Sequence, residues 1–264
     1  MKAGMTMRLD RYLAECGYGT RGEVKRIIGK GQVEKGGRIA TDPGAHVLPG
    51  EPVSVMGREA VRKGPVYLAM NKPPGYVSAT EDRGHPTVVS LLDQGEYGHC
   101  GLFPAGRLDL DVTGLLLLTN DGPFAHRLTS PRKAVPKTYV ADLSERLGQA
   151  GAEALTRGLT LGDGHQTAPA MVWEMGGRRV ALRLTEGKYH QVKRMFAAVG
   201  NNVERLVRVG VGGLWLNLGG LRAEFGPTGE APWGLGGAAL DLGDMAIGTY
   251  RDIGTAGMEA ALDG

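Results

Sequence analysis

The feature that most constrains this chain is a charged stretch that runs directly into a continuous apolar one. The residues from Ala105 to Gly114 include Arg107, Asp109 and Asp111, and Leu115 to Leu118 follow without interruption. An apolar run bounded by polar turn residues predicts a buried strand. Ionised side chains are seldom placed beside such a strand unless a partner compensates their charge, so Asp109 is a candidate functional residue.

Length and composition predict a folded protein with one large domain or two unequal ones. The chain has 264 residues, of which 42% are hydrophobic, and no run of eighteen apolar residues. Because Met1 to Arg8 lacks the apolar centre of a secretory signal, we expect a cytoplasmic protein. Cys16 and Cys100 have no neighbouring Cys or His at metal-ligand spacing, so we expect neither a metal site nor a disulfide framework.

The N-terminal segment predicts two short helices, the second with a basic outer face. Leu9 and Leu13 have helical spacing. Thr20 to Glu23 has the pattern of a capping box at the start of the second helix, and Gly29 and Gly31 mark its end. The cations of this helix lie outside its apolar stripe; they are Arg21, Lys25 and Arg26, with Lys30 at the end.

A strand-turn-strand pattern follows the second helix. Gln32 to Glu34 and Arg38 to Ala40 flank the turn at Lys35 to Gly37. We expect Val33 and Ile39 to point inward.

Further strands are expected near Val47 and at Val53 to Val55. Together with the segment from Met7 to Ala14, this helix-helix-hairpin arrangement resembles the S4 RNA-binding domain. The charge of the whole chain, +3, is too small to indicate a nucleic-acid partner, so the local cluster carries the argument. A solvated helix face is the alternative interpretation. On the resemblance, the residues expected to contact RNA are Arg8, Arg11, Arg21, Lys25, Arg26 and Lys30.

The rest of the chain predicts an α+β domain around a mixed, mostly antiparallel sheet, because many alternating strands are joined by few helices. The expected divisions are an S4-like domain at 7–56, a linker at 57–64, a catalytic domain at 65–232 and a Gly/Ala-rich, poorly ordered tail at 233–264. The expected helices of the second domain are Pro123 to Leu128, Ser144 to Arg157 and Tyr189 to Val199.

The last of these helices offers a partner for Asp109. Val192, Met195 and Phe196 lie on one buried stripe, and Lys193 and Arg194 lie beside it. Cations that follow a glycine at a strand-to-helix junction commonly approach a phosphate or a carboxylate. Simple solvation of the two cations is the alternative.

Five motifs together resemble the bacterial rRNA pseudouridine synthases that carry an amino-terminal S4 domain, and the resemblance extends from Arg8 to about Pro232. The motifs are Gly106 to Asp109 with Asp111, Thr113-Gly114, Asn120 to Gly122, Lys137 to Tyr139, and Lys188 to Met195. Three further segments are most similar to the small-subunit group, which modifies uridine 516 of 16S rRNA: Asn71 to Pro73, Ser130 to Arg132 and Met195 to Asn201. A 23S rRNA uridine is the alternative target.

The resemblance implies that a uridine within RNA is isomerised without a metal or cofactor. Asp109 is the implied catalytic carboxylate, acting either as a nucleophile or by taking a proton from the ribose; both routes stay open. Lys193 is its implied ion-pair partner, and Tyr139 is implied as a further catalytic residue that stacks on the target base and assists proton transfer. The implied substrate-binding residues are Arg107, which fills the gap left by the everted nucleotide, and Leu206, which lines the pocket; Lys188 and Arg194 are expected to contact RNA.

Two other functions fit part of the pattern. Asp109 and Asp111 as paired carboxylates are typical of glycosidases, although Asp111 is more simply explained by hydrogen bonds to local backbone amides. A ribosome-assembly protein with a vestigial carboxylate is the second. The expected partner is ribosomal RNA in a partly assembled subunit, with no membrane and a monomeric chain.

Overall fold

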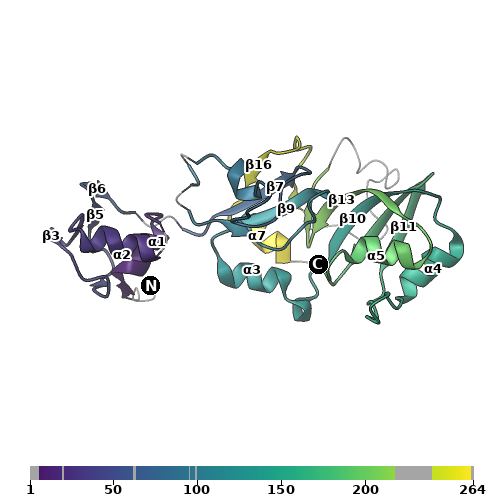
Figure 1. Ribbon diagram of the computed structural model, residues 1–264, viewed down its shortest axis with the longest axis horizontal. Coiled ribbons are helices and arrows are strands. Elements are labelled where there is room, and N and C mark those ends of the chain that lie inside the picture. Colours follow the sequence, from purple (N-terminus) through teal and green to yellow (C-terminus); the bar gives the residue numbers. More distant parts are fainter. Residues whose placement is uncertain are drawn as a thin grey trace. The chain divides into compact units, whose positions relative to one another are not determined.

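The computed structural model describes residues 6–19, 21–61, 64–94, 96–98, 100–217 and 240–262. They divide into two compact units, which Figure 1 shows as ribbons. Unit 1 comprises Met1–Val66 and Leu92–Leu102, and unit 2 comprises Tyr67–Leu91 and Phe103–Gly264. The segment Leu92–Leu102, expected in the catalytic domain, therefore groups with unit 1.

Unit 1 has the expected two helices and short strands. The helices α1 and α2 pack around a core that includes Leu9, Leu13, Val24 and Ile28. Thr20 of the expected capping box lies outside the described residues. The elements are β1 (Met7–Arg8), α1 (Leu9–Glu15), α2 (Arg21–Gly29), β2 (Val33–Lys35), β3 (Arg38–Ile39), β4 (His46–Val47), β5 (Val53–Val55) and β6 (Arg58–Glu59).

Two expectations for unit 1 are wrong. Ile39 is 68% exposed because it lies directly opposite Glu34, and opposed residues of paired strands share a face. The expected linker begins too early: β6 pairs with β5 through a tight turn in which Met56 and Gly57 both have positive φ, as a type I′ hairpin turn requires. Ala60, which follows β6, is buried in the core of the unit.

Unit 2 is built on one mixed sheet, as expected for an α+β domain. Among the residues that the structure describes, ten strands join it, with the main order β11-β12-β10-β13-β9-β7-β16. The β9–β13 pair is parallel, and the other neighbours along this order are antiparallel. The strands are β7 (Tyr67–Lys72), β8 (Phe103–Pro104), β9 (Thr113–Thr119), β10 (Lys137–Leu143), β11 (Met171–Gly176), β12 (Arg179–Leu184), β13 (Val203–Val211), β14 (Leu214–Trp215), β15 (Leu240–Asp241) and β16 (Tyr250–Asp252).

Short helices accompany this sheet. The α-helices are α3 (Gly122–Thr129), α4 (Gln149–Arg157), α5 (Gln191–Ala198) and α7 (Gly254–Leu262), with 3-10 turns η1 (Val88–Leu91) and η2 (Pro131–Lys133). The α3 helix starts at Asp121, whose carboxylate accepts from the Phe124 amide (3.0 Å) and from the Tyr67 hydroxyl (2.7 Å). The motif Asn120 to Gly122 therefore includes a helix cap that is tied to the sheet.

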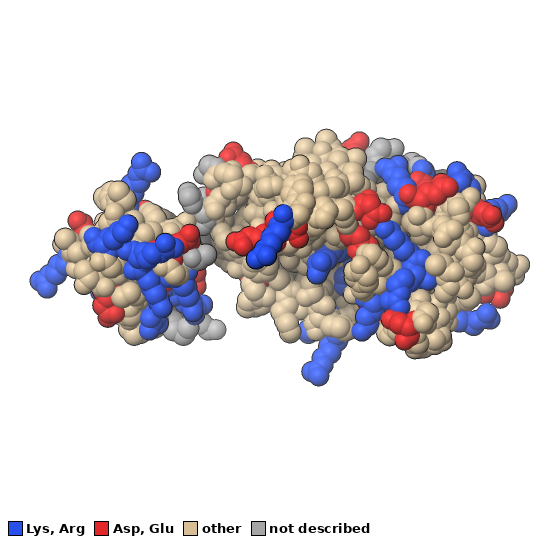
Figure 2. All heavy atoms as spheres, viewed as in Figure 1, with Lys and Arg blue, Asp and Glu red and all other residues tan. Residues whose placement is uncertain are grey.

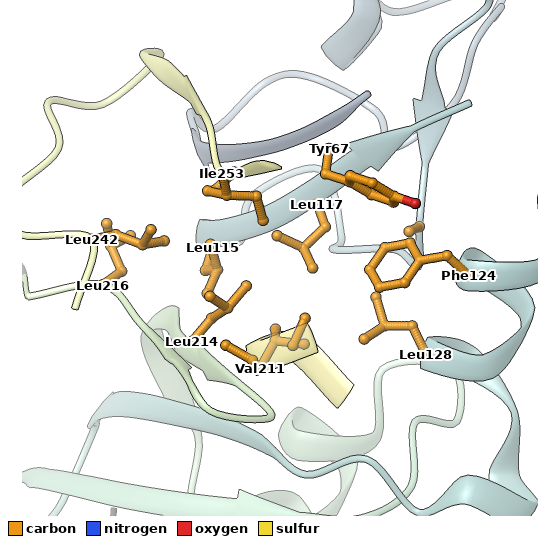
Figure 3. Packing of buried hydrophobic residues seen from close by; sticks show 14 of the residues in the cluster. Tyr67, Leu115, Leu117, Phe124, Leu128, Val211, Leu214, Leu216, Leu242 and Ile253 are labelled. Carbon is orange, nitrogen blue, oxygen red and sulfur yellow. The ribbon is translucent and has the colours of Figure 1, made fainter. Parts of the chain in front are cut away.

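The main core lies between the sheet and the helices α3 and α7 (Figure 3). Leu115 and Leu117 of β9 point into it together with Tyr67 of β7, and the Phe124 ring packs edge-on against Tyr67. The run of leucines is thus a central strand buried on both faces, since Leu116 and Leu118 are also fully buried.

The expectation of a poorly ordered tail is wrong for residues 240–262, and 233–239 lie outside the described residues. Tyr250–Asp252 forms the edge strand β16 on β7, and α7 buries Ala260 and Ala261 in the main core. Asn71 of β7 holds the segment before β16 in place, since its side chain donates to the Met245 carbonyl at 2.7 Å. The Gly/Ala-rich composition reflects close packing here: a Cβ on Gly257 would lie 2.4 Å from the Ile253 side chain.

Candidate active site

Asp109 lies on the loop between β8 and β9, and the backbone of this loop is fixed from several sides. Ser78 binds both polar groups of Leu108: its hydroxyl donates to the Leu108 carbonyl (2.9 Å) and accepts from the Leu108 amide (3.0 Å). The amide of Gly75 donates to the Leu110 carbonyl at 2.8 Å. Within the loop, the Val112 amide donates to the Asp109 carbonyl, which closes a turn under the carboxylate.

Two buried cations hold the same loop through its carbonyl groups. Lys72, at the end of β7, is fully buried, and its ammonium donates to the carbonyls of Leu110 (3.3 Å), Val112 (2.9 Å) and Pro73 (3.0 Å). Arg208 of β13 is 4% exposed and donates to the carbonyls of Arg107 (3.3 Å) and Leu115 (2.7 Å). The loop is therefore positioned at both ends before any substrate binds.

The Lys72 ammonium is also part of the electrostatics of the site. Burial lowers the pKa of Lys72 to about 8, and the nearby carboxylates of Asp111 and Asp109 act in the opposite direction.

Gly114 allows β9 to approach β13 where the loop enters the sheet. It has φ of +104° and lies opposite Arg208, and a Cβ at this position would be 2.2 Å from the Arg208 carbonyl oxygen. The Thr113-Gly114 motif is therefore explained by a close approach of two backbones.

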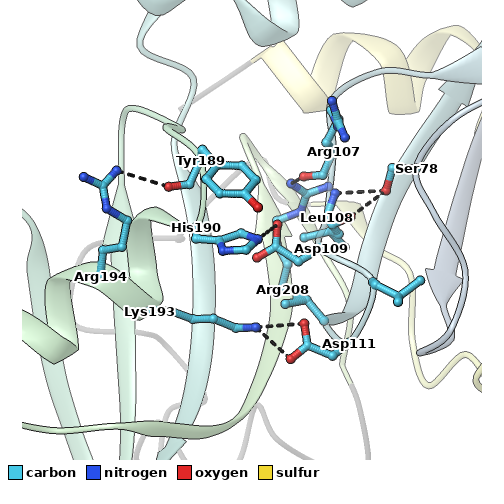
Figure 4. A network of polar contacts seen from close by, with 12 residues as sticks. Ser78, Arg107, Leu108, Asp109, Asp111, Tyr189, His190, Lys193, Arg194 and Arg208 are labelled. Atoms are coloured by element: carbon cyan, nitrogen blue, oxygen red, sulfur yellow. Dashed lines mark hydrogen bonds and ion pairs between the residues drawn. The ribbon is translucent and has the colours of Figure 1, made fainter. Parts of the chain in front are cut away.

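The expected ion pair between Asp109 and Lys193 is wrong. Lys193 Nζ lies 2.7 Å from each carboxylate oxygen of Asp111, whereas the side chain beside Asp109 is His190, whose Nε2 is 3.5 Å from Asp109 Oδ1 (Figure 4). The loop makes a turn between the two aspartates, so one helix start supplies a separate partner to each of them. The expectation that Asp111 mainly binds local amides is wrong for the same reason: the hydrogen bond from Lys193 is the main cause that lowers the pKa of the Asp111 carboxyl.

Tyr139 and Leu206 lie on the face of the sheet that carries Arg208. Tyr139 is directly opposite Arg208 across the β10–β13 pair, and residues two apart on a strand share a face, which places Leu206 beside them. Leu206 is 6% exposed, and Tyr139 is half-buried. Because Arg208 is opposite Gly114 on its other side, Tyr139 lies two strands from the start of β9.

The remaining expected residues of unit 2 are divided between solvent and structure. Arg107 is exposed, and its side chain extends away from the Asp109 carboxylate (Figure 4). Lys188 is exposed and makes no ion pair with any described residue. Arg194 forms an ion pair with Asp163 (2.5 Å) and donates to the Tyr189 carbonyl (3.3 Å), so it fixes the chain that leads into α5.

Several basic residues of unit 1 lie on or beside α1 and α2, in the part of the molecule where Figure 2 shows blue side chains grouped together. Arg8 and Arg11 are paired with Asp10 and Glu15, each at 2.8 Å. Four others are exposed and form no ion pair within the described part of the chain; we call them the α2 basic face, and they are Arg21, Lys25, Arg26 and Lys30.

Sequence reasoning missed the residues that support the loop. Ser78, Lys72 and Arg208 act on backbone carbonyls and amides, which carry no sequence signature, and only the motif from Asn71 to Pro73 hinted at Lys72. His190 was visible beside Lys193, but nothing in the pattern indicated that it, rather than the lysine, contacts Asp109. Among the described residues no group of three or more His, Cys, Asp or Glu side chains is arranged to hold a metal ion, and no described helix has the length and apolarity to cross a membrane.

Comparison with known proteins assigns both units. Residues 66–198 match the family described as RNA pseudouridylate synthase, and residues 7–53 match the S4 domain. An uncharacterized RNA pseudouridine synthase of Bacillus subtilis, YtzG, is 46% identical over 78% of this chain and 88% of its own length. Ribosomal small subunit pseudouridine synthase A of Escherichia coli is 40% identical over 85% of this chain and 97% of its own. A crystal structure of a pseudouridylate synthase aligns over 97% of this chain and 99% of that one, with a TM-score of 0.59 and 30% identity.

Proposed function

Because the chain belongs to the RNA pseudouridine synthase family and carries an S4 domain, we propose that it isomerises a uridine of ribosomal RNA, with Asp109 as the catalytic carboxylate. The observation that carries this assignment is the loop of Asp109, whose backbone is anchored by Lys72 and Arg208 while the carboxylate itself is 28% exposed. Rigid backbone with an accessible reacting group is what a preorganised site requires.

In the proposed reaction, the bond between N1 of uracil and C1′ of ribose breaks, the base turns, and a bond between C5 and C1′ forms. The proton of C5 leaves, and N1 gains one, so the product is an isomer of the substrate. The Asp109 carboxylate acts either on C1′ as a nucleophile or on a ribose proton as a base. Tyr139 stacks on the uracil, and Leu206 lines the pocket beside it.

His190 and Lys193 have separate roles in this proposal. His190 contacts Asp109, and Lys193 neutralises Asp111, so the negative charge next to the reacting carboxylate is compensated. This arrangement disfavours the glycosidase alternative, in which one carboxyl must stay protonated. Lys193 lowers the pKa of Asp111, which is the opposite of what a general acid needs.

The small-subunit relatives support a target in 16S rRNA, and we propose uridine 516. We further propose that the enzyme acts as a monomer on a partly assembled subunit. A 23S rRNA uridine is the second candidate. Chemical mapping of pseudouridine in both rRNAs from a strain lacking this protein decides between them. Loss of the modification from 23S rRNA alone contradicts the small-subunit target, and light scattering of the purified chain tests the monomer.

The catalytic assignment is tested by tritium release from RNA labelled at C5 of uridine. Asp109→Asn is expected to abolish release. Asp142→Asn is a matched control, because Asp142 is 29% exposed and ion-paired with Arg179 but lies at the far end of β10. Release at the wild-type rate by Asp109→Asn refutes the assignment. A wild-type chain that binds the RNA and releases no tritium supports the ribosome-assembly alternative instead.

A further inference from the structure

Next to Asp109 the chain presents an aromatic ring to solvent. Tyr189 is 76% exposed, the largest exposed fraction among the large apolar side chains that the structure describes. One face of its ring stacks on the His190 imidazole, with ring centres 3.8 Å apart and planes 19° from parallel. The exposed fraction leaves the ring open to contact from solvent.

The backbone under this ring is held in place. His190 has a left-handed conformation (φ 50°, ψ 30°), which is uncommon for residues other than glycine and costs about 1 kcal/mol or more. The Tyr189 carbonyl accepts from Arg194, and the Lys188 amide donates to the Gln191 side chain at 2.8 Å. The ring is therefore preorganised, although it buries little apolar surface that would stabilise the fold.

The position of the ring relates it to the proposed reaction. His190 contacts Tyr189 on one side and lies 3.5 Å from Asp109 on another, so a single imidazole separates the exposed ring from the carboxylate (Figure 4). Lys188, immediately before the ring, is exposed and forms no ion pair with the described residues. A flat ring with a free cation beside it matches the base and the phosphate of one nucleotide.

We propose that the stacked pair Tyr189–His190 is a docking platform for one unpaired base of the substrate RNA, next in sequence to the uridine that reacts. This inference rests on the proposed function and adds a second nucleotide subsite to it. Unpaired bases are the parts of folded RNA that proteins read by stacking, and each such contact is sensitive to loss of the aromatic ring. Lys188 lies where it contacts the phosphate of the same nucleotide.

The test measures RNA binding in full-length protein that carries Asp109→Asn, so that affinity is read without the chemical step. In this background Tyr189→Leu, which keeps apolar bulk but removes the ring, is expected to weaken binding about fivefold to a hundredfold. Tyr189→Phe keeps the ring and is expected to stay within about twofold. Met171→Ala removes another exposed apolar side chain, 52% exposed on β11, and is expected to change nothing.

Abasic substrates identify the base. An RNA that lacks the base at one position beside the target uridine is expected to bind weakly to the protein that retains Tyr189. Its affinity is expected to equal that of intact RNA for the Tyr189→Leu variant. Combining the abasic RNA with the Tyr189→Leu variant is then expected to cause no further loss of affinity. Unchanged affinity of Tyr189→Leu overturns the proposal, and so do fully additive losses with every neighbouring abasic position. Failure of the proposed function is detected by a different assay, because in that case the wild-type chain releases no tritium.

Discussion

Replacing Lys72 by Met tests the role of the buried ammonium that holds the loop of Asp109. The substitution keeps a long apolar stem and removes the donor to the carbonyls of Leu110 and Val112. Those carbonyls stay at the active site without their charged donor, so the loop loses one of its anchors. A displacement of about 1 Å lowers rates about a hundredfold, and we expect kcat/KM in tritium release at pH 7 to fall by at least that factor.

The stability of the same variant has a defined pH dependence. Burial lowers the pKa of Lys72 from 10.5 to about 8, so between these values the folded chain holds fewer protons than the unfolded chain. The free energy of unfolding of the wild type therefore rises with pH across this window, by at most about 3 kcal/mol. The cost of burying the charge is present in full below pH 8 and is absent above 10.5.

Urea unfolding from pH 7 to 10, followed by tryptophan fluorescence, measures this effect as the difference between wild type and Lys72→Met. Subtraction removes the contribution of Lys137, whose pKa is also lowered to about 8 by burial and which both proteins retain. We expect the difference to grow in favour of the wild type above pH 8. A difference that does not change with pH, together with normal activity, refutes the reasoning. Lys25→Met, at an exposed position, is the control.

Three further predictions concern other parts of the chain. Gly114→Ala is expected to lower the free energy of unfolding in urea by about 3 kcal/mol or more, because the added Cβ meets the Arg208 carbonyl. Gly122→Ala is the control: a Cβ there has open space at a helix start, so the free energy of unfolding is expected to change by less than about 1 kcal/mol. Neutralising the α2 basic face is expected to weaken RNA binding and to flatten its dependence on salt, by about 0.7 to 0.9 in log-log slope per lost phosphate contact, and an unchanged slope argues against that surface. Lys193→Met is expected to change the free energy of unfolding by less than about 1 kcal/mol, because its partner Asp111 is 71% exposed; a larger loss means that the pair supports the fold.

The sequence by itself determined the two units, most of their elements and the position of the Asp109 loop before β9. Apolar periodicity and turn residues are local properties, so they located β9, α2 and α5 to within a few residues. The motif around Asp109 and the basic α2 helix were readable for the same reason. Composition misled where it was used in place of packing: glycine and alanine after residue 239 indicated a loose tail, although small side chains there allow α7 to pack closely into the core.

Only the tertiary structure decided which groups meet at the site. His190 precedes the short helix α5, and Lys193 lies in its first turn. Because the loop turns between the two aspartates, Asp111 contacts Lys193 and Asp109 contacts His190. Lys72 and Arg208 come from strands distant in sequence and bind backbone carbonyls, which every residue possesses. A sequence specifies which side chains are present, but a contact between a side chain and the backbone depends on how the strands are aligned in space.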